Sequence, residues 1–219
     1  LDVGEREITA LIGPSGCGKT TTLKMINRLI QPDTGKIYLN EEDITSKDKV
    51  ELRRHIGYVI QQIGLFPNMT VAQNICVVPK LLKYSKEQCD QIVRDMLAMV
   101  EMPYEQYANK YPSEMSGGQQ QRVGVARALV VDPEIIFADE PTGNLDSNTS
   151  REVMELMQQV VHEKQQTLVM VTHDNHLASF ADRIFHIIDG KIVRIDDMTG
   201  KSKEEREKEE KKREEEASI

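Results

Sequence analysis

The 219-residue sequence contains no tryptophan, and aromatic residues make up only 5% of it. Its first aromatic residue is Tyr38, so residues 1–37 offer no ring on which a planar ligand could stack. No apolar run approaches the roughly 18 residues that span a bilayer, and no signal peptide is visible. We therefore expect no direct membrane insertion, and any membrane role would come through a partner.

Acidic residues outnumber basic ones, and cysteine is scarce. There are 28 Lys and Arg residues against 36 Asp and Glu, a formal net charge of −8, which gives no support for a nucleic-acid partner. The three cysteines, Cys17, Cys76 and Cys89, lack metal-binding spacing, and their odd number fits a reducing compartment. The length suits one α/β domain with room for a subdomain.

A glycine-rich motif lies near the start of the chain. Residues 13–20 read GPSGCGKT, which matches G-x-x-x-x-G-K-[ST], between an apolar run at 8–12 and a helix-like segment at 20–29. Loop N–H groups and a helix N-terminus then converge on one anion. The motif predicts a phosphate-binding loop in which Lys19 reaches the β- and γ-phosphates and the Thr20 hydroxyl ligates Mg²⁺.

Apolar runs further along the chain predict a buried sheet. Residues 135–138 are fully apolar and end at Asp139 and Glu140, and residues 167–172 end at His173. Such strands are typical of a parallel sheet covered on both faces, which binds ligands at the carboxyl ends of its strands. Alternation predicts strands at 36–40 and 52–60, and Asp189-Gly190 predicts a hairpin between 184–188 and 191–195.

The middle of the chain reads as helical. Residues 66–128 form a mainly helical insertion, in which Ile92, Met96, Leu97, Met99 and Val100 recur at helical spacing and are expected to lie in the core. Two further helices are predicted at 120–131 and 148–163. The Ser-Gly-Gly-Gln stretch at 116–119 directly precedes the first of them, which is another anion-binding arrangement.

The order of these motifs carries a resemblance to a known family. GPSGCGKT, a strand-end glutamine, SGGQQQR, IIFADEPT, NLD and THD follow one another up to about residue 197. This resembles the ATP-binding cassette (ABC) transporter ATPases. The resemblance implies an α/β P-loop NTPase fold of the RecA-like type, with a mainly parallel sheet. Residues 1–65 and 128–198 would form this core, 66–127 a helical subdomain with the signature motif, and 199–219 a charged tail, helical or disordered.

The resemblance also implies roles for individual residues, with ATP and Mg²⁺ as cofactors. Glu140 would be the general base, His173 the switch histidine and Gln61 the Q-loop residue. Asp146 matches the D-loop. Mg²⁺ would be held by Thr20, Gln61 and Asp139. The nucleotide phosphates would be held by Gly13, Ser15, Gly16, Cys17, Gly18, Lys19, Thr20 and Thr21, and the partner's ATP would be capped by Ser116, Gly117, Gly118 and Gln119.

The partners that the resemblance implies are transmembrane permease subunits and a second cassette, in a homodimer or pseudo-dimer at the cytoplasmic face of the cell membrane. Residues 60–67 through 111–114 resemble the ATPases of betaine, carnitine and choline importers, whereas residues 138–147 onward look more like lipoprotein and peptide exporter ATPases. Substrate and direction therefore stay open. The family's N-terminal strands, one with an adenine-stacking aromatic residue, have no counterpart in this sequence.

Two alternatives remain at this stage. One is a non-transport ABC ATPase of DNA repair or translation, which would usually carry coiled-coil insertions or a second cassette, and neither is visible. The other is a truncated cassette with weak activity. Intact Lys19, Asp139, Glu140 and His173 argue against the second alternative. Co-purification with a permease, or a permease reading frame next to this one, would distinguish them from a transport subunit.

Overall fold

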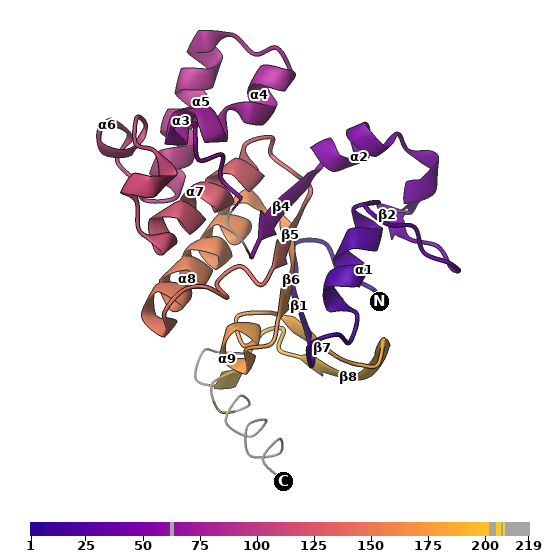
Figure 1. The fold of residues 1–219 in the computed structure, drawn as a ribbon. Helices are drawn as coiled ribbons and strands as arrows, with labels where there is room; N and C mark the ends of the chain where they lie inside the picture. The colour runs from indigo at the N-terminus through magenta and orange to yellow at the C-terminus, as the bar shows by residue number, and fades with distance from the viewer. Residues whose placement is uncertain (62–63, 202–204, 207, 209–219) are drawn as a thin grey trace.

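The computed structural model describes residues 1–61, 64–201, 205, 206 and 208, and its centre is a six-stranded sheet (Figure 1). The strand order is β4-β5-β6-β1-β7-β8. All neighbours pair in parallel except β7 and β8, which are antiparallel. The strands are β1 (Ile8–Ile12), β4 (Ile56–Ile60), β5 (Ile135–Asp139), β6 (Thr167–Thr172), β7 (Arg183–Ile188) and β8 (Lys191–Asp197). The predicted mainly parallel α/β core is confirmed.

Helices cover both faces of this sheet (Figure 1). On one side lie α1 (Lys19–Ile26) and α2 (Lys49–Arg54), and on the other α7 (Gly117–Leu129) and α8 (Ser147–Lys164). Side chains alternate along a strand. Leu11 therefore enters the core cluster on the side of α1 and α2, while Ala10 and Ile12 enter the cluster on the side of α7 and α8. Coverage on both sides explains why the central strands are almost wholly apolar.

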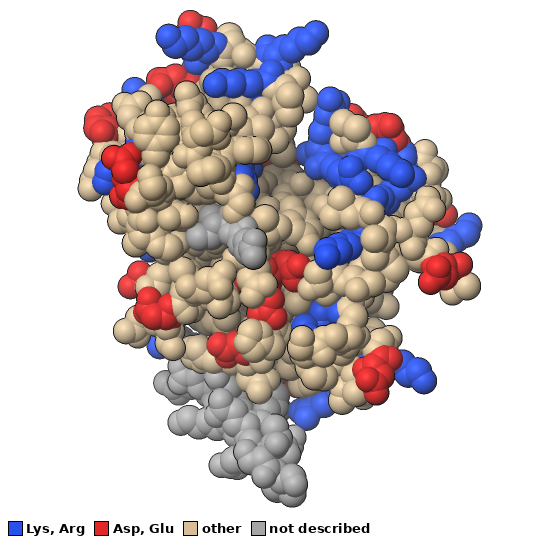
Figure 2. Space-filling view, in the orientation of Figure 1, with Lys and Arg blue, Asp and Glu red and all other residues tan. Residues whose placement is uncertain are grey.

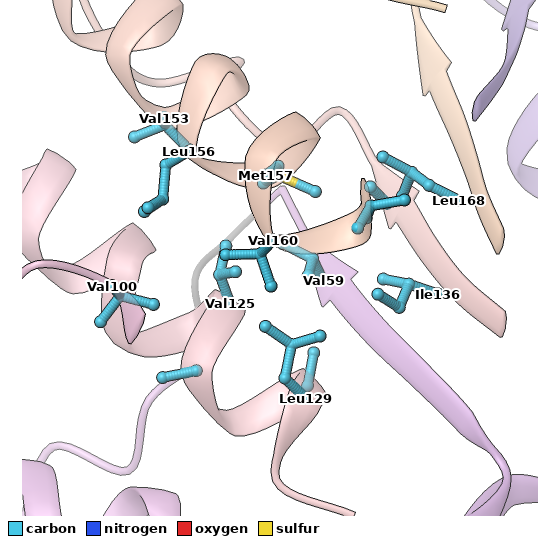
Figure 3. Close-up of a cluster of buried hydrophobic side chains, with 14 of the residues drawn as sticks. Val59, Val100, Val125, Leu129, Ile136, Val153, Leu156, Met157, Val160 and Leu168 are labelled. Atoms are coloured by element: carbon cyan, nitrogen blue, oxygen red, sulfur yellow. The ribbon is translucent and has the colours of Figure 1, made fainter. Parts of the chain in front are cut away.

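The larger cluster fixes α7 and α8 on the sheet (Figure 3). Val125 and Leu129 of α7 and Met157 and Val160 of α8 face side chains of β4, β5 and β6, among them Val59, Ile136 and Leu168. Each of these side chains is less than one-tenth exposed. Full burial of one such side chain is worth about 1.5–3 kcal/mol, so these contacts fix the C-terminal halves of α7 and α8 against the sheet.

The elements between residues 64 and 134 are helical, as predicted. They are α3 (Val71–Ile75), α4 (Val77–Leu81), α5 (Lys86–Met99), α6 (Tyr104–Tyr107), the 3₁₀ turn η2 (Pro112–Glu114) and α7. Capping boxes at Thr70 and Ser85 start α3 and α5. Met96, Leu97 and Val100 are buried in the same cluster as the sheet face. The division of the chain at residues 66 and 127 stays a prediction.

Local capping chemistry overrides the strand predicted at residues 52–60. Leu52 belongs to α2, because the Asp48 side chain accepts hydrogen bonds from the N–H groups of Val50 and Glu51 and starts a helix; only Ile56–Ile60 is a strand. Of the strand predicted at 36–40, only β2 (Tyr38–Leu39) pairs, with β3 (Glu42–Asp43), before the 3₁₀ turn η1 (Ile44–Ser46).

Other boundaries shift by a few residues. The helix predicted at 20–29 ends at Ile26, and the one predicted at 120–131 already begins at Gly117. A short helix, α9 (Asn175–Ala178), was not predicted. The hairpin at Asp189-Gly190 is confirmed, with positive φ at both residues. Most of the charged tail from 199 to 219 lies outside the described residues. Among the described helices, none has the length and hydropathy of a membrane span.

Candidate functional site

The phosphate loop leaves β1 at Gly13 and enters α1 at Lys19. A Cβ atom at position 13 would lie 2.0 Å from the carbonyl oxygen of Ile187, so only glycine fits there. Gly18, with φ +105°, leads directly into α1, and it supplies no side-chain cap for the first N–H groups of that helix. Those N–H groups are thus available to an anion, which is what a phosphate-binding loop requires.

Lys19 is buried, with only 7% of its surface exposed. Its Nζ donates hydrogen bonds to the carbonyl oxygens of Gly13 (2.7 Å) and Pro14 (3.0 Å) and lies 3.7 Å from the Sγ of Cys17. The side chain therefore folds across the loop and places its ammonium charge inside it. Cys17, which belongs to the same loop, is also buried.

Four parallel strands bring the predicted site residues to one edge of the sheet. Register pairs Ile12 with Thr172, and Asp139 with both Ile60 and Val171. The residues that follow these strands, which are Gly13, Gln61, Glu140 and His173, therefore lie side by side. Within this edge the Thr20 hydroxyl donates to Asp139 Oδ1 at 2.7 Å.

Glu140 and His173 are in direct contact. The ring Nδ1 of His173 lies 2.7 Å from Oε2 and 2.9 Å from Oε1 of Glu140. An ionised carboxylate only accepts hydrogen bonds, so Nδ1 carries the proton in this contact. Glu140 is held in the left-handed region with φ +50°, and its N–H donates to the carbonyl oxygen of Val171. The side chain of Glu140 is 16% exposed, against 66% for His173.

These groups surround a cavity of about 440 Å³. Its lining residues are Ser15, Gly16, Gly18, Lys19, Thr20, Thr21, Gln61, Glu140 and His173. The loop N–H groups and Lys19 suit phosphate oxygens. The hydroxyl of Thr20, the carboxylate of Asp139 and the amide of Gln61 offer the oxygen ligands that Mg²⁺ prefers, so the donor set fits this ion.

The signature residues lie elsewhere. Ser116 starts α7 with a capping box: its Oγ accepts from the Gln119 N–H (3.3 Å), and Gln119 Oε1 accepts from the Ser116 N–H (3.1 Å). Gln119 Nε2 also donates to the Tyr107 hydroxyl at 3.1 Å. A Cβ on Gly118 would lie 2.4 Å from Thr149 of α8. None of residues 116–119 lines the phosphate cavity, so one chain does not bring the two anion-binding loops together.

Asp146 starts the neighbouring helix, α8. Its carboxylate accepts hydrogen bonds from the Thr149 hydroxyl (2.6 Å) and from the Thr149 N–H (3.1 Å). These two bonds, the hydroxyl first, hold the pKa of Asp146 below its usual range. Asp146 is exposed and is not among the residues that line the cavity.

Two residues that the sequence did not single out hold the segment around Gln61. Asn144 Nδ2 donates to the Gln61 carbonyl oxygen at 3.2 Å, and Arg127 Nη1 donates to the Gly64 carbonyl oxygen at 2.7 Å. Burial lowers the pKa of Arg127. Asn144 stands within the NLD motif, but the partners are 83 and 63 residues away, and sequence spacing carries no signal for such contacts.

A phosphate loop at the carboxyl edge of a mainly parallel sheet, beside strand-end acids and a separate Ser-Gly-Gly-Gln helix cap, defines an ATP-binding cassette. The sequence model of the family described as "ABC transporter" matches residues 1–143, and the chain belongs to this family.

Similar proteins include ATP-binding proteins of bacterial uptake systems. The chain is 49% identical over 197 residues to the carnitine transport ATP-binding protein OpuCA of Listeria monocytogenes, covering 90% of this chain and 49% of that protein. It is 51% identical over 196 residues to the glycine betaine/carnitine/choline transport ATP-binding protein OpuCA of Bacillus subtilis, covering 89% and 51%. The chain thus spans about half the length of these relatives.

Solved structures agree with the fold. The dimeric ATP-binding cassette MJ0796, from Methanocaldococcus jannaschii and bound to ADP and Pi in a post-hydrolysis state, superposes with a TM-score of 0.80 at 38% identity. That match covers 91% of this chain and 89% of the other. The P-loop NTPase fold expected from the motifs is thereby confirmed.

Proposed function

We propose that this chain binds ATP with Mg²⁺ and hydrolyses it to drive transport through a membrane permease. The observation that carries the proposal is the convergence of Lys19, Thr20, Gln61, Glu140 and His173 on one cavity, with Asp139 bonded to Thr20. Four separate sequence motifs meet there. Each supplies a group that phosphoryl transfer requires.

Residues 13–21 hold the triphosphate in this proposal. The N–H groups at the start of α1 donate hydrogen bonds to phosphate oxygens, and Lys19 turns its ammonium from the loop carbonyls to the β- and γ-phosphates. Thr20, Asp139 and Gln61 would hold Mg²⁺, which when bound neutralises phosphate charge. The chain's own groups position the γ-phosphate at the edge where Glu140 lies.

Glu140 acts as the general base. It takes a proton from a water molecule, whose oxygen attacks the γ-phosphorus while the bond to the bridging oxygen of ADP breaks. His173 positions this carboxylate through the two contacts at 2.7 and 2.9 Å. The left-handed backbone at Glu140 and the bond from its N–H to Val171 add to this positioning.

A second copy, or a second cassette, completes each site. Ser116 to Gln119 form an anion-binding helix start that does not face the cavity of its own chain. A head-to-tail dimer would place this cap on the γ-phosphate of the partner, so that bound ATP holds the two copies together. The dimeric state of the solved relative supports this arrangement.

The membrane partner is a permease at the cytoplasmic face of the membrane. A cleft of about 550 Å³ between α2 and α4 offers a docking surface, with exposed Val50, Phe66 and Leu81 beside Arg53 and Arg54. Figure 2 shows Lys and Arg gathered on the face of the molecule next to this hollow. An apolar segment that carries a carboxylate fits both the exposed side chains and the charge.

The names of the relatives point to the substrate class. Carnitine, glycine betaine and choline are small quaternary ammonium compounds, and the ATP-binding proteins matched at 49% and 51% identity serve their transport. We therefore assign import of this class of compound as the transport that the chain powers.

The base assignment is tested by replacing Glu140 with Gln. The amide keeps the shape but cannot take the proton, so ATP turnover is expected to fall by about 10²–10⁴-fold while ATP binding by calorimetry persists. Glu163→Gln, at an exposed acid near the far end of α8, is the control and keeps normal turnover. Near-normal hydrolysis by Glu140→Gln would remove Glu140 from the role.

The transport assignment is tested in proteoliposomes with a permease that co-purifies with the chain. ATP-dependent uptake of labelled betaine, carnitine or choline supports it, whereas uptake that does not depend on ATP contradicts it. Leu81→Asp should prevent co-purification, because a carboxylate would enter the apolar cleft, and should leave ATP turnover of the isolated chain intact.

A further inference from the structure

The side-chain amide of Gln119 is held at both of its polar atoms. Its Oε1 accepts the hydrogen bond from the Ser116 N–H at 3.1 Å, which is one half of the capping box at the start of α7. Its Nε2 donates to the hydroxyl oxygen of Tyr107 at 3.1 Å. The Ser116 N–H can only donate, so it selects the amide oxygen of Gln119 and leaves the amide nitrogen to be anchored by Tyr107.

Tyr107 can anchor this amide because its own position does not depend on α7. It is the last residue of α6, and its half-buried ring packs against the larger core cluster. The Lys110 ammonium lies 4.8 Å from the centre of that ring. The backbone beside it is fixed as well, since the carbonyl oxygens of Ala108 and Lys110 accept hydrogen bonds from the N–H groups of Ala72 and Val71 at the start of α3.

The capping box decides which N–H groups of α7 remain for a ligand. Those of Ser116 and Gln119 are used by the cap itself. Those of Gly117 and Gly118, the first two residues of the helix, have no carbonyl oxygen within the helix to bond. An anion at this helix start would therefore be received by these two N–H groups, and the cap sets the direction in which they point.

We propose that Tyr107 is a positioning residue for Gln119. Its hydroxyl holds the amide whose oxygen caps Ser116, and it thereby keeps the first turn of α7 in the shape that receives an anion. Tyr107 is not among the residues that line the phosphate cavity of its own chain, so its effect falls on the partner's nucleotide and acts through Gln119. For that effect the inference rests on the proposed head-to-tail dimer, whereas the anchoring of Gln119 can be measured without nucleotide.

The anchoring is tested in the nucleotide-free chain by amide hydrogen exchange with mass spectrometry. Tyr107→Phe removes the hydroxyl and keeps the ring, so a peptide that spans Ser116 and Gln119 should exchange about two- to tenfold faster. Tyr104→Phe is the matched control, because it removes a hydroxyl of the same helix that bonds Asp90, and it should leave this peptide unchanged. Equal exchange in the wild type and in Tyr107→Phe would overturn the proposal.

The effect on ATP is tested by dimer formation in a Glu140→Gln background, with dissociation constants from analytical ultracentrifugation. Two symmetric sites each lose one hydrogen bond, so Tyr107→Phe should weaken the ATP-bound dimer about four- to hundredfold. ATP binding by the monomer, which uses the phosphate loop, should keep its wild-type affinity. Tyr104→Phe should change neither quantity. A dimer of undiminished affinity in Tyr107→Phe would contradict the positioning role.

A double-mutant cycle with Gln119→Ala separates positioning from packing. This variant removes the side chain on which Tyr107 acts, so adding Tyr107→Phe should change both dimer affinity and peptide exchange by no more than about twofold. A full second loss would show that Tyr107 acts through packing and would refute the proposal. A wild-type chain that forms no ATP-dependent dimer would refute the head-to-tail arrangement instead, and the exchange cycle would still decide whether Tyr107 holds Gln119.

Discussion

The hydroxyl of Thr20 donates a 2.7 Å hydrogen bond to Asp139 Oδ1, and the two residues are 119 positions apart in sequence. One stands at the start of α1 and the other at the end of β5. Their oxygens meet because β5 and β1 run in the same direction on either side of β6, which brings both carboxyl ends to one edge. Two oxygen atoms of the proposed Mg²⁺ site thus lie close together beside the phosphate loop.

Replacing Thr20 with Val tests this pair. Valine keeps the shape and removes the hydroxyl, so the carboxylate of Asp139 loses its donor and the proposed metal site loses a ligand. We expect the Mg²⁺-dependent gain in ATP affinity to fall about tenfold, while affinity measured in EDTA stays near the wild-type value. Calorimetry with and without Mg²⁺ gives both numbers.

Thr21→Val is the matched control, because Thr21 lines the same cavity but has no bond to Asp139. It should keep the gain in affinity that Mg²⁺ provides. An equal loss in EDTA and in Mg²⁺ for Thr20→Val would mean that Thr20 holds the nucleotide itself rather than the metal.

Lys19→Ala should abolish measurable ATP binding. The Lys19 ammonium is the cation inside the loop, and its removal leaves the β- and γ-phosphates without a fixed partner. The carbonyl oxygens of Gly13 and Pro14 also lose their donor, so a small drop in thermal stability of the apo chain is expected.

The control for this variant is Lys24→Ala, on the exposed face of the same helix. It removes the same charge from the chain without touching the loop. An unchanged ATP affinity of Lys19→Ala would refute the phosphate-loop assignment.

The sequence predicted those parts of the site whose position in the fold follows from the order of strands and motifs along the chain. A motif that opens a helix after a strand, and acids that end a strand, must lie at the carboxyl edge of a parallel sheet, which is where Lys19 and Glu140 are found. The strand predicted over Leu52 was wrong, because alternation cannot reveal that Asp48 accepts two N–H bonds and starts a helix.

The contacts of Asn144 and Arg127 could not be predicted from the sequence either. Both residues stand in segments that were recognised, but their acceptors are backbone carbonyl oxygens on another strand end. Any residue supplies such a carbonyl, so no residue type at the acceptor position marks the pair. Only the packing of α7 and of residues 143–145 against the end of β4 brings donor and acceptor together.

Ser116→Arg should prevent ATP-dependent dimer formation and leave ATP binding by the monomer intact. The new side chain places a long cation at the helix start proposed to receive the γ-phosphate of the partner, and it removes the N-cap of α7. Dimer formation is measured by size-exclusion chromatography with ATP, in a Glu140→Gln background that keeps ATP from being consumed.

Ser46→Arg adds the same side chain at an exposed serine, the last residue of η1, and should leave the dimer unaffected. Circular dichroism of Ser116→Arg checks that loss of the cap has not unfolded α7. A normal ATP-dependent dimer in this variant would refute the head-to-tail arrangement.

The choice of nucleotide base should be poor in this chain. Among the described residues that line the phosphate cavity there is no phenylalanine or tyrosine, and no aromatic residue precedes Tyr38 in the sequence. Stacking of a base on an aromatic ring contributes about 1–3 kcal/mol, which corresponds to roughly 5- to 150-fold in affinity. Without it, the contacts to triphosphate and Mg²⁺ dominate, and these are the same for ATP and GTP.

We therefore expect ATP, GTP and inorganic tripolyphosphate to bind the 219-residue chain within about tenfold of one another in calorimetry with Mg²⁺. Lys19→Ala should abolish measurable binding of all three, because the loss falls on the shared phosphates. An affinity for ATP about a hundredfold higher than that for GTP would mean that another part of the chain binds the adenine.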